Sequence, residues 1–359
     1  MSGTTERGGT QSADGRRDDV AALMLTVGSY PAWLTVAAVT VGALVVCALG
    51  VTVPPWAGYL PLAASLVVFG LPHGAVDHLA SARAADRPVT PAWLGGVGLL
   101  YLLLGGVYVA CWVVAPVAAA VFFVALTWFH WGQGDLYALD VLGGGYLRGG
   151  GVRAATLVVR GGLPMLVPLI RFPDQYRAVV GAWVALFGGA FDATWLASPR
   201  LRATVGVAFA GLTLGTLLWG RRRVDGTRAG RAWRRDAAET CLLWAFFLLV
   251  PPLVAVGVYF CVWHSLRHVV RLVGVDDGAR ATLGRRGAVA ALARTGREAV
   301  PLTALSLLSL LGFGAAVGVR TGASELAALY LVFISVVTLP HVAVVTWMDR
   351  AERAETVKG

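Results

Sequence analysis

Six histidines are the residues of this chain with the greatest capacity for chemistry. Each of them lies in or at the end of a strongly apolar segment. An ionisable side chain at membrane depth is costly, and it usually faces the interior of a helical bundle, where it has a partner or a task. We therefore expect these imidazoles to act inside the protein. The six are His73, His78, His130, His264, His268 and His341.

The most informative pair is His264 and His268, in the segment CVWHSLRHVVRL at 261–272. Residues four apart share one face of a helix, so both imidazoles could reach a single metal ion. Imidazole binds iron, zinc, copper and nickel, and an all-imidazole site without thiolate suits a redox-active iron that keeps positions open for O2. Paired membrane histidines also serve as axial ligands of haem, so the spacing leaves both cofactors open.

The composition indicates which class of protein carries these histidines. Of 359 residues, 57% are hydrophobic and 14% are charged, which is more apolar surface than one soluble core could bury. Apolar runs near the roughly 20 residues needed to cross a bilayer recur along the chain. We predict an all-α, polytopic transmembrane helical bundle of eight to ten spans, placed as a multi-pass protein in the cell membrane. The short alternating segments of a β-barrel are absent.

The net charge of +10 does not indicate binding to nucleic acid. The arginines fall in the connections between apolar runs, and they have no aromatic platform or nucleic-acid-binding motif among them. Positive charge beside membrane spans, facing lipid headgroups, is the better interpretation. The expected partner of the surface is therefore the lipid bilayer.

The apolar runs divide the chain into predicted elements. We expect a disordered tail at 1–25, one membrane-embedded domain at 26–348 and a short tail at 349–359. The long run at 238–271 contains Pro251–Pro252, so a kink or break is expected there. The segment 178–191 is short enough to be a partial helix. Full spans are predicted at about 30–50, 56–78, 93–114, 117–137, 152–170, 201–219, 300–319 and 325–347.

Counting crossings predicts which connections share a side of the membrane. The spans that carry His73 and His130 end on the same side, and the loops 79–92, 138–151 and 272–299 would lie there together. Each of these loops contains arginine, so this side is predicted to be cytoplasmic. The same count places the arginine-rich loop 220–237 on the opposite side, unless 178–191 does not cross or 238–272 forms two pieces.

Four histidine motifs together resemble one known family. PHGAVDH at 72–78, FHWG at 129–132, WHSLRH at 263–268 and LPH at 339–341 are similar to motifs of the Brp/Blh family of membrane-bound β-carotene 15,15'-dioxygenases. The resemblance covers about residues 30–347. It implies a non-haem Fe(2+) held by four histidines, which fall on His73, His130, His264 and His268.

The resemblance also implies a reaction and its partners. Members of this family use O2 to cleave the central 15,15' double bond of β-carotene, and the two molecules of all-trans-retinal supply microbial rhodopsins. The partners expected for this chain are therefore β-carotene, O2 and, through retinal, a functional link to a rhodopsin apoprotein. A carotenoid dissolves in the bilayer, so a site that opens sideways between helices would receive it without contact with water.

Three polar residues near the predicted ligands have open roles. His78 lies five residues after His73, about 140° around a helix, so we expect it beside the metal or as a helix cap rather than bound to the metal. Asp77 is expected either to accept a hydrogen bond that orients an imidazole or to be an ordinary carboxylate at a helix end. His341 follows Pro340, and it is expected either to approach the site or only to pack against it.

Aromatic residues flank the predicted ligands in sequence. Trp131 follows His130 directly, and Tyr259 and Trp263 precede His264. One interpretation is aromatic packing at the membrane boundary. The other is that these rings line an apolar slot for a long conjugated polyene.

Two other functions use histidines in membranes. A membrane di-iron desaturase or hydroxylase would need more histidines, in HxxxH and HxxHH boxes, and this chain has six histidines and no HxxHH box. A transporter could relay protons or metal ions through histidines, but the related internal repeats of many transporters are not detected. A metal count with an absorption spectrum would separate the three functions.

Overall fold

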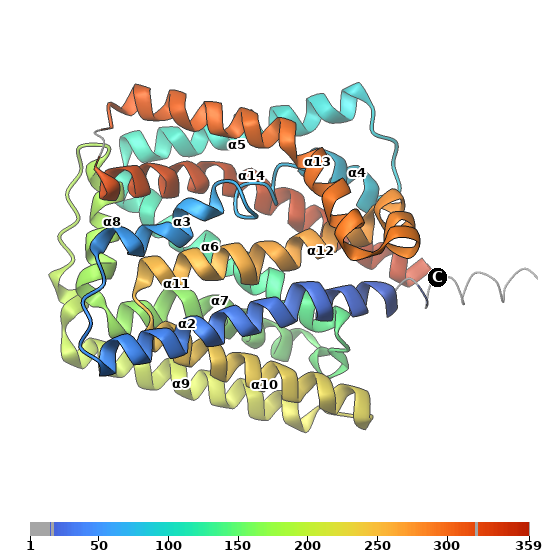
Figure 1. The fold of residues 1–359 in the computed structure, drawn as a ribbon, viewed down its shortest axis with the longest axis horizontal. Helices are drawn as coiled ribbons and strands as arrows, with labels where there is room; N and C mark the ends of the chain where they lie inside the picture. The colour runs from blue at the N-terminus through green and yellow to red at the C-terminus, as the bar shows by residue number, and fades with distance from the viewer. Residues whose placement is uncertain (1–14, 16–17, 320–321, 359) are drawn as a thin grey trace, which may run out of the picture.

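The computed structural model describes residues 15, 18–319 and 322–358, and all regular secondary structure in this part of the chain is helical (Figure 1). Among the described residues, eight helices are long and apolar enough to cross a membrane. The predicted all-α, multi-span architecture is confirmed, and eight spans lie at the lower end of the predicted range.

The helices pack as one bundle with their long axes roughly aligned (Figure 1). Those of the first half are η1 Met24–Ser29, α2 Tyr30–Ala48, η2 Pro55–Tyr59, α3 Leu60–Ser65, α4 Asp77–Ala84, α5 Pro91–Val114, α6 Pro116–Val141, η3 Gly145–Leu147 and α7 Gly150–Arg171. Those of the second half are α8 Pro173–Ala185, η4 Thr194–Ala197, α9 Pro199–Arg222, α10 Gly226–Leu249, α11 Pro252–Val258, η5 Tyr259–Ser265, α12 Leu266–Val275, α13 Asp277–Val317 and α14 Ala323–Lys358.

Proline begins many of these helices. It is the first residue of α5, α6, α8, α9 and α11. Proline suits the first helical position because its missing N–H would have no partner there and its φ is already helical. The Pro251–Pro252 break, predicted from the sequence, is confirmed, since α10 ends at Leu249 and α11 begins at Pro252.

The break at Pro251 also decides where the arginine-rich segment 220–237 lies. Because α10 and the α11–α12 helix run in opposite directions, the start of α10 lies at the same end of the bundle as the end of α12 (Figure 1). Arg223 and Arg235 donate hydrogen bonds to the backbone carbonyls of Arg148 and Leu142. The segment thus lies beside the loop 138–151. The prediction that it lies on the opposite side of the membrane is wrong, and 238–272 forms two pieces, which was one of the stated alternatives.

Two predicted elements differ from the structure. The span predicted at 56–78 is instead two short helices, η2 and α3, followed by irregular turns at 66–76 and then α4. A β-carbon at Gly70 would lie 2.5 Å from the carbonyl oxygen of Ser65, a tight approach that only glycine permits. The predicted loop 272–299 is largely helical, because α12 continues to Val275 and α13 starts at Asp277, with a kink at Gly287 where φ is 78°.

The chain ends are more helical than the predicted boundaries. The first candidate span begins at Asp18, eight residues before the predicted domain start. Of the predicted tail 1–25, residues 1–14, 16 and 17 lie outside the described residues. At the other end α14 continues through the predicted tail to Lys358.

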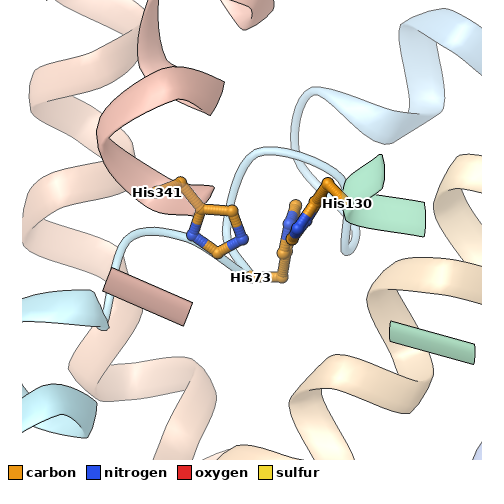
Figure 2. Close-up of side chains that lie close together, drawn as sticks. All are labelled: His73, His130 and His341. Atoms are coloured by element: carbon orange, nitrogen blue, oxygen red, sulfur yellow. The ribbon is translucent and has the colours of Figure 1, made fainter. Parts of the chain in front are cut away.

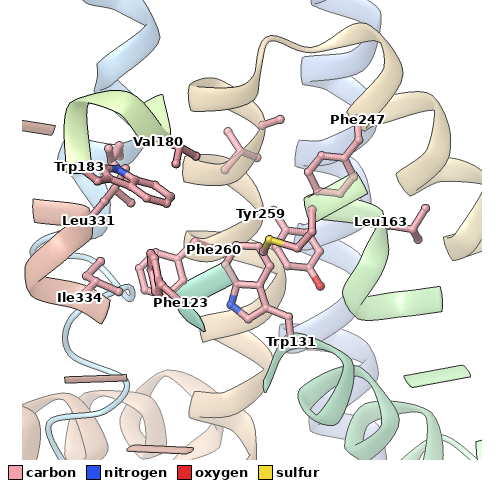
Figure 3. Packing of buried hydrophobic residues seen from close by; sticks show 14 of the residues in the cluster. Phe123, Trp131, Leu163, Val180, Trp183, Phe247, Tyr259, Phe260, Leu331 and Ile334 are labelled. Carbon is pink, nitrogen blue, oxygen red and sulfur yellow. The ribbon is translucent and has the colours of Figure 1, made fainter. Parts of the chain in front are cut away.

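The bundle has an aromatic core and an apolar exterior. Phe123, Trp131, Tyr259 and Phe260 belong to one buried cluster contributed by α6, α11, η5 and neighbouring helices (Figure 3). Large apolar residues such as Leu102, which is 70% exposed, cover the outside. Such a surface is stable against lipid chains, and the chain is a multi-pass membrane protein.

Candidate metal centre

Five of the six histidines converge at the centre of the bundle, although they come from four separate parts of the chain. His73, His130 and His341 each offer a ring nitrogen, and these nitrogens lie within 4.8 Å of one another (Figure 2). His264 and His268 lie against this group. The ring centroids of His130 and His264 are 4.7 Å apart, and those of His268 and His341 are 5.2 Å apart.

Different elements position these side chains. His130 projects from α6 and His341 from α14, directly after Pro340. His73 lies in the irregular segment 66–76, whose turns let its backbone approach the centre. His264 lies in the π-helix η5 and His268 in the α-helix α12 that continues from it. Single π-helical turns inside α-helices are frequent at functional sites, because the extra residue re-aims neighbouring side chains.

Several ring nitrogens of these histidines have no hydrogen-bond partner in the described part of the chain and are free to bind a metal ion. His73 Nε2, His130 Nδ1, His268 Nε2 and His341 Nε2 are buried and have no hydrogen-bond partner among the described residues. The Nε2 atoms of His130 and His264 lie 3.0 Å apart. Buried polar atoms are nearly always satisfied, and several unpartnered nitrogens within one histidine cluster need an explanation. Because imidazole nitrogens are good ligands for transition metals, the cluster fits a bound metal ion.

Hydrogen bonds on the far side of two rings fix their orientation. His341 Nδ1 lies 2.7 Å from Asp77 Oδ2, and the same carboxylate oxygen accepts a hydrogen bond from the Tyr101 hydroxyl at 2.5 Å. His73 Nδ1 contacts the carbonyl oxygen of Gly70 and lies 3.3 Å from Ser265 Oγ. Such partners hold a metal-binding imidazole in one tautomer and one direction. The acceptor role expected for Asp77 thus has a counterpart in the structure, and its partner is His341.

A cavity of about 810 Å³ lies beside the histidine centre. His73, His130 and His341 form part of its wall, and most of the other lining side chains are apolar. This volume is within the roughly 300–1,000 Å³ range of small-molecule sites. His264 and His268 do not line this cavity but a small polar pocket with Asp135, so they approach the centre from the other side.

The remaining predicted site residues lie around the cavity or behind it. His78 lines the cavity wall outside the histidine cluster, and burial lowers the pKa of its imidazole. Trp131 also lines the cavity, whereas Tyr259 and Trp263 do not. Tyr259 packs behind Trp131 with ring centroids 4.8 Å apart. The Trp263 indole donates to Asp135 Oδ1 at 3.0 Å.

A buried ion-pair network behind the histidines was missed by the sequence analysis. The Arg160 side chain is 0% exposed, and its guanidinium contacts Asp135, at 2.7 Å, and Glu239. Arg267 Nη2 donates to Glu239 Oε1 at 2.6 Å, and the Arg267 guanidinium lies 4.1 Å from the centroid of the Trp263 ring. Paired in this way, buried charges can persist where isolated ones could not. One residue of this network could have been noticed in the sequence. Arg267 lies inside the WHSLRH motif, directly before His268.

This arrangement defines a class: a multi-pass helical membrane protein with a buried cluster of histidines that could hold a metal ion, on the wall of an apolar cavity. Comparison with known proteins then specifies the family. The family model described as beta-carotene 15,15'-dioxygenase matches residues 64–349. The chain belongs to this β-carotene 15,15'-dioxygenase family and is an enzyme of that kind, which confirms the resemblance seen in the four histidine motifs.

Individual relatives agree with the family match. The chain is 55% identical to "Probable beta-carotene 15,15'-dioxygenase Blh" of Halobacterium salinarum, over 84% of this chain and 88% of that protein. It is 32% identical to "Probable beta-carotene 15,15'-dioxygenase Brp" of the same species, over 79% of this chain and 82% of that protein. No solved structure matches the chain.

Proposed function

We propose that the histidine centre holds ferrous iron and that the enzyme uses O2 to cleave the central double bond of β-carotene, giving two molecules of all-trans-retinal. The observation that carries this proposal is the convergence of buried imidazoles, several with unpartnered nitrogens, on the wall of an apolar cavity of about 810 Å³. Neutral nitrogen ligands suit a redox-active iron. The cavity suits a hydrocarbon with almost no polar groups.

The proposed ligands are His73, His130, His264 and His268, the set that the family resemblance implies. His341 is a fifth candidate, because its Nε2 is unpartnered and it belongs to the closest group of three histidines. When bound, iron would supply the electrons that let O2 react with a closed-shell alkene. The protein supplies the rings that hold the ion and the hydrogen bonds that aim those rings.

The cavity walls determine which bond of the polyene lies at the centre. In the proposed reaction the double bond between carbons 15 and 15' breaks, and each of these carbons gains one oxygen atom of the same O2 molecule as an aldehyde. The two aldehydes account for both oxygen atoms, so the balance needs no external reductant. Apolar residues such as Phe123, Trp131 and Phe260 exclude water and hold the chain of double bonds in place.

The proposed location follows from the chemistry of substrate and product. Both β-carotene and retinal dissolve in a bilayer, so an enzyme in the cell membrane can exchange them directly with lipid. The arginine-bearing ends of α9 and α12 would then face the cytoplasm. A rhodopsin apoprotein in the same membrane is the proposed recipient of retinal.

The proposed function is tested in a bacterium that accumulates β-carotene. Expression of the chain should remove the yellow colour and produce retinal that chromatography detects. A purified sample should contain one iron per chain and show no Soret band. Two irons per chain would instead favour a desaturase, a Soret band would favour haem, and no bound metal would favour transport.

Variants of the predicted ligands sharpen this test. We expect His264→Ala and His268→Ala to abolish retinal formation while membrane insertion stays intact, because each removes one imidazole from the centre. Retained cleavage with full iron content in either variant would remove that residue from the ligand set. Iron content and retinal yield are therefore measured on the same preparations.

A further inference from the structure

The cavity beside the histidine centre reaches the surface of the bundle in one direction. Most of the residues that line it are buried or half-buried. The exposed lining residues that the structure describes are confined to two helices, α5 and α13. They are Leu94, Gly98 and Leu102 on α5, and Leu305 and Ser309 on α13.

The surface at this opening is the kind that faces lipid. Both helices are candidate membrane spans, and along the apolar part of α13 no residue is buried inside the bundle. Leu102 and Leu305 are 70% and 56% exposed. Water-filled entrances have polar rims, whereas this rim is leucine, glycine and a serine whose hydroxyl is bonded to the carbonyl oxygen of Leu305 at 2.8 Å.

Large buried side chains line the cavity where α6 and α8 meet. Phe123 from α6 and Trp183 from α8 pack edge to face with their ring centroids 5.4 Å apart, and Val180 lies beside them (Figure 3). These three side chains are 5% to 8% exposed. No lining residue of α8 is exposed, so the cavity reaches the surface between α5 and α13 and not at α8.

We propose that the gap between α5 and α13 is the mouth through which the carotenoid enters from the bilayer, one ring first, until that ring stops against Phe123 and Trp183. This inference rests on the proposed function and specifies the route of its substrate. His73 and His341 form part of the wall of the same cavity. The half of the polyene beyond the centre is then enclosed, and the other half still lies near the mouth.

The experiment narrows the mouth and compares each change with its neighbour on the same helix. Leu102→Trp and Ser309→Trp put larger side chains at two positions that line the cavity opening. Leu103→Trp and Leu308→Trp are matched controls, because Leu103 and Leu308 are 57% and 65% exposed but do not line the cavity. Purified, iron-loaded enzymes are assayed in liposomes that contain β-carotene, and the initial rate of retinal formation is measured.

We expect the two lining variants to lose at least about tenfold in initial rate and to keep their iron, and the controls to stay within about twofold of wild type. Equal rates in lining variants and controls would contradict the proposed entrance between α5 and α13 and would leave the dioxygenase function unaffected. Absence of retinal from wild type and controls would overturn the function itself. If a tryptophan variant fails to fold, Ser309→Leu replaces it, with an intermediate loss expected and an unchanged rate contradicting the proposal.

Discussion

The contact between Asp77 and His341 allows a quantitative test of the metal centre. Asp77 is 2% exposed, and its Oδ2 lies 2.7 Å from His341 Nδ1. The Asp77 carboxylate orients this ring so that its Nε2 points at the other histidines. Asp77→Ala removes that carboxylate. The ring would then be free to rotate away from the centre, and its Nδ1 would lose its only hydrogen-bond acceptor among the described residues.

The expected loss in metal affinity is about 10–100-fold, the usual effect of removing an orienting carboxylate behind a metal-bound histidine. This corresponds to about 1.4–2.8 kcal/mol of binding free energy. A hydrogen bond to a charged group contributes about 1.5–3 kcal/mol, so two independent arguments give the same range. Asp77→Asn keeps an acceptor oxygen without the charge, and its affinity should fall between those of Asp77→Ala and wild type.

The assay is an anaerobic titration of metal-free protein with Fe(2+), followed by the absorption or the quenching of intrinsic fluorescence. Tyr101→Phe is the matched control, because it removes the other hydrogen bond to Asp77 Oδ2 and leaves the bond to His341 in place. We expect the control to bind metal within about twofold of wild type. Equal dissociation constants for Asp77→Ala and wild type would refute the proposed orienting role and the membership of His341 in the centre.

Two further changes test the surroundings of the centre. Glu239→Gln removes one of the two carboxylates that Arg160 and Arg267 share, the other being Asp135, so the free energy of unfolding should fall by about 3–5 kcal/mol, measured by thermal denaturation in detergent. Arg153→Gln, which breaks the partly exposed pair with Asp140, should cost less than about 1 kcal/mol, and equal losses would contradict the argument. Trp183→Ala enlarges the cavity at α8, so the cut should move off centre and yield two unequal aldehydes by mass spectrometry; retinal alone would show that Trp183 is not the stop.

The sequence predicted the long spans well, because about 20 apolar residues bounded by proline leave few alternatives. It failed for the segment that carries His73. Its apolar composition resembles that of a span, but the turns at 66–76 depend on the contact between Gly70 and Ser65, which a hydropathy pattern does not contain. The expected angle of about 140° between His73 and His78 assumed that one helix carries both residues. In the structure, α4 begins only at Asp77.

The candidate site was predicted in part for a similar reason. The four histidine motifs are local patterns, so His73, His130, His264 and His268 could be singled out one segment at a time. The network of Asp135, Arg160, Glu239 and Arg267 has no local pattern, because its members come from four helices. The charged residues inside the membrane domain were therefore not apparent from the local sequence. The interaction of His341 with Asp77 joins residues 264 positions apart, a contact that periodicity does not reveal.

The same network has a consequence for biogenesis. Helix α10 carries Glu239 near its middle and does not qualify as a span by composition, whereas α7 carries Arg160 at full burial. A lone charge at the centre of a membrane helix costs about 2.5–3.5 kcal/mol on insertion scales, and the last cation of the network, Arg267, is synthesised after both. We therefore expect α6, α7 and α10 to stay at the insertion machinery until α12 emerges, and the four helices, which carry two arginines and two carboxylates of the network, to move into lipid as a neutralised group.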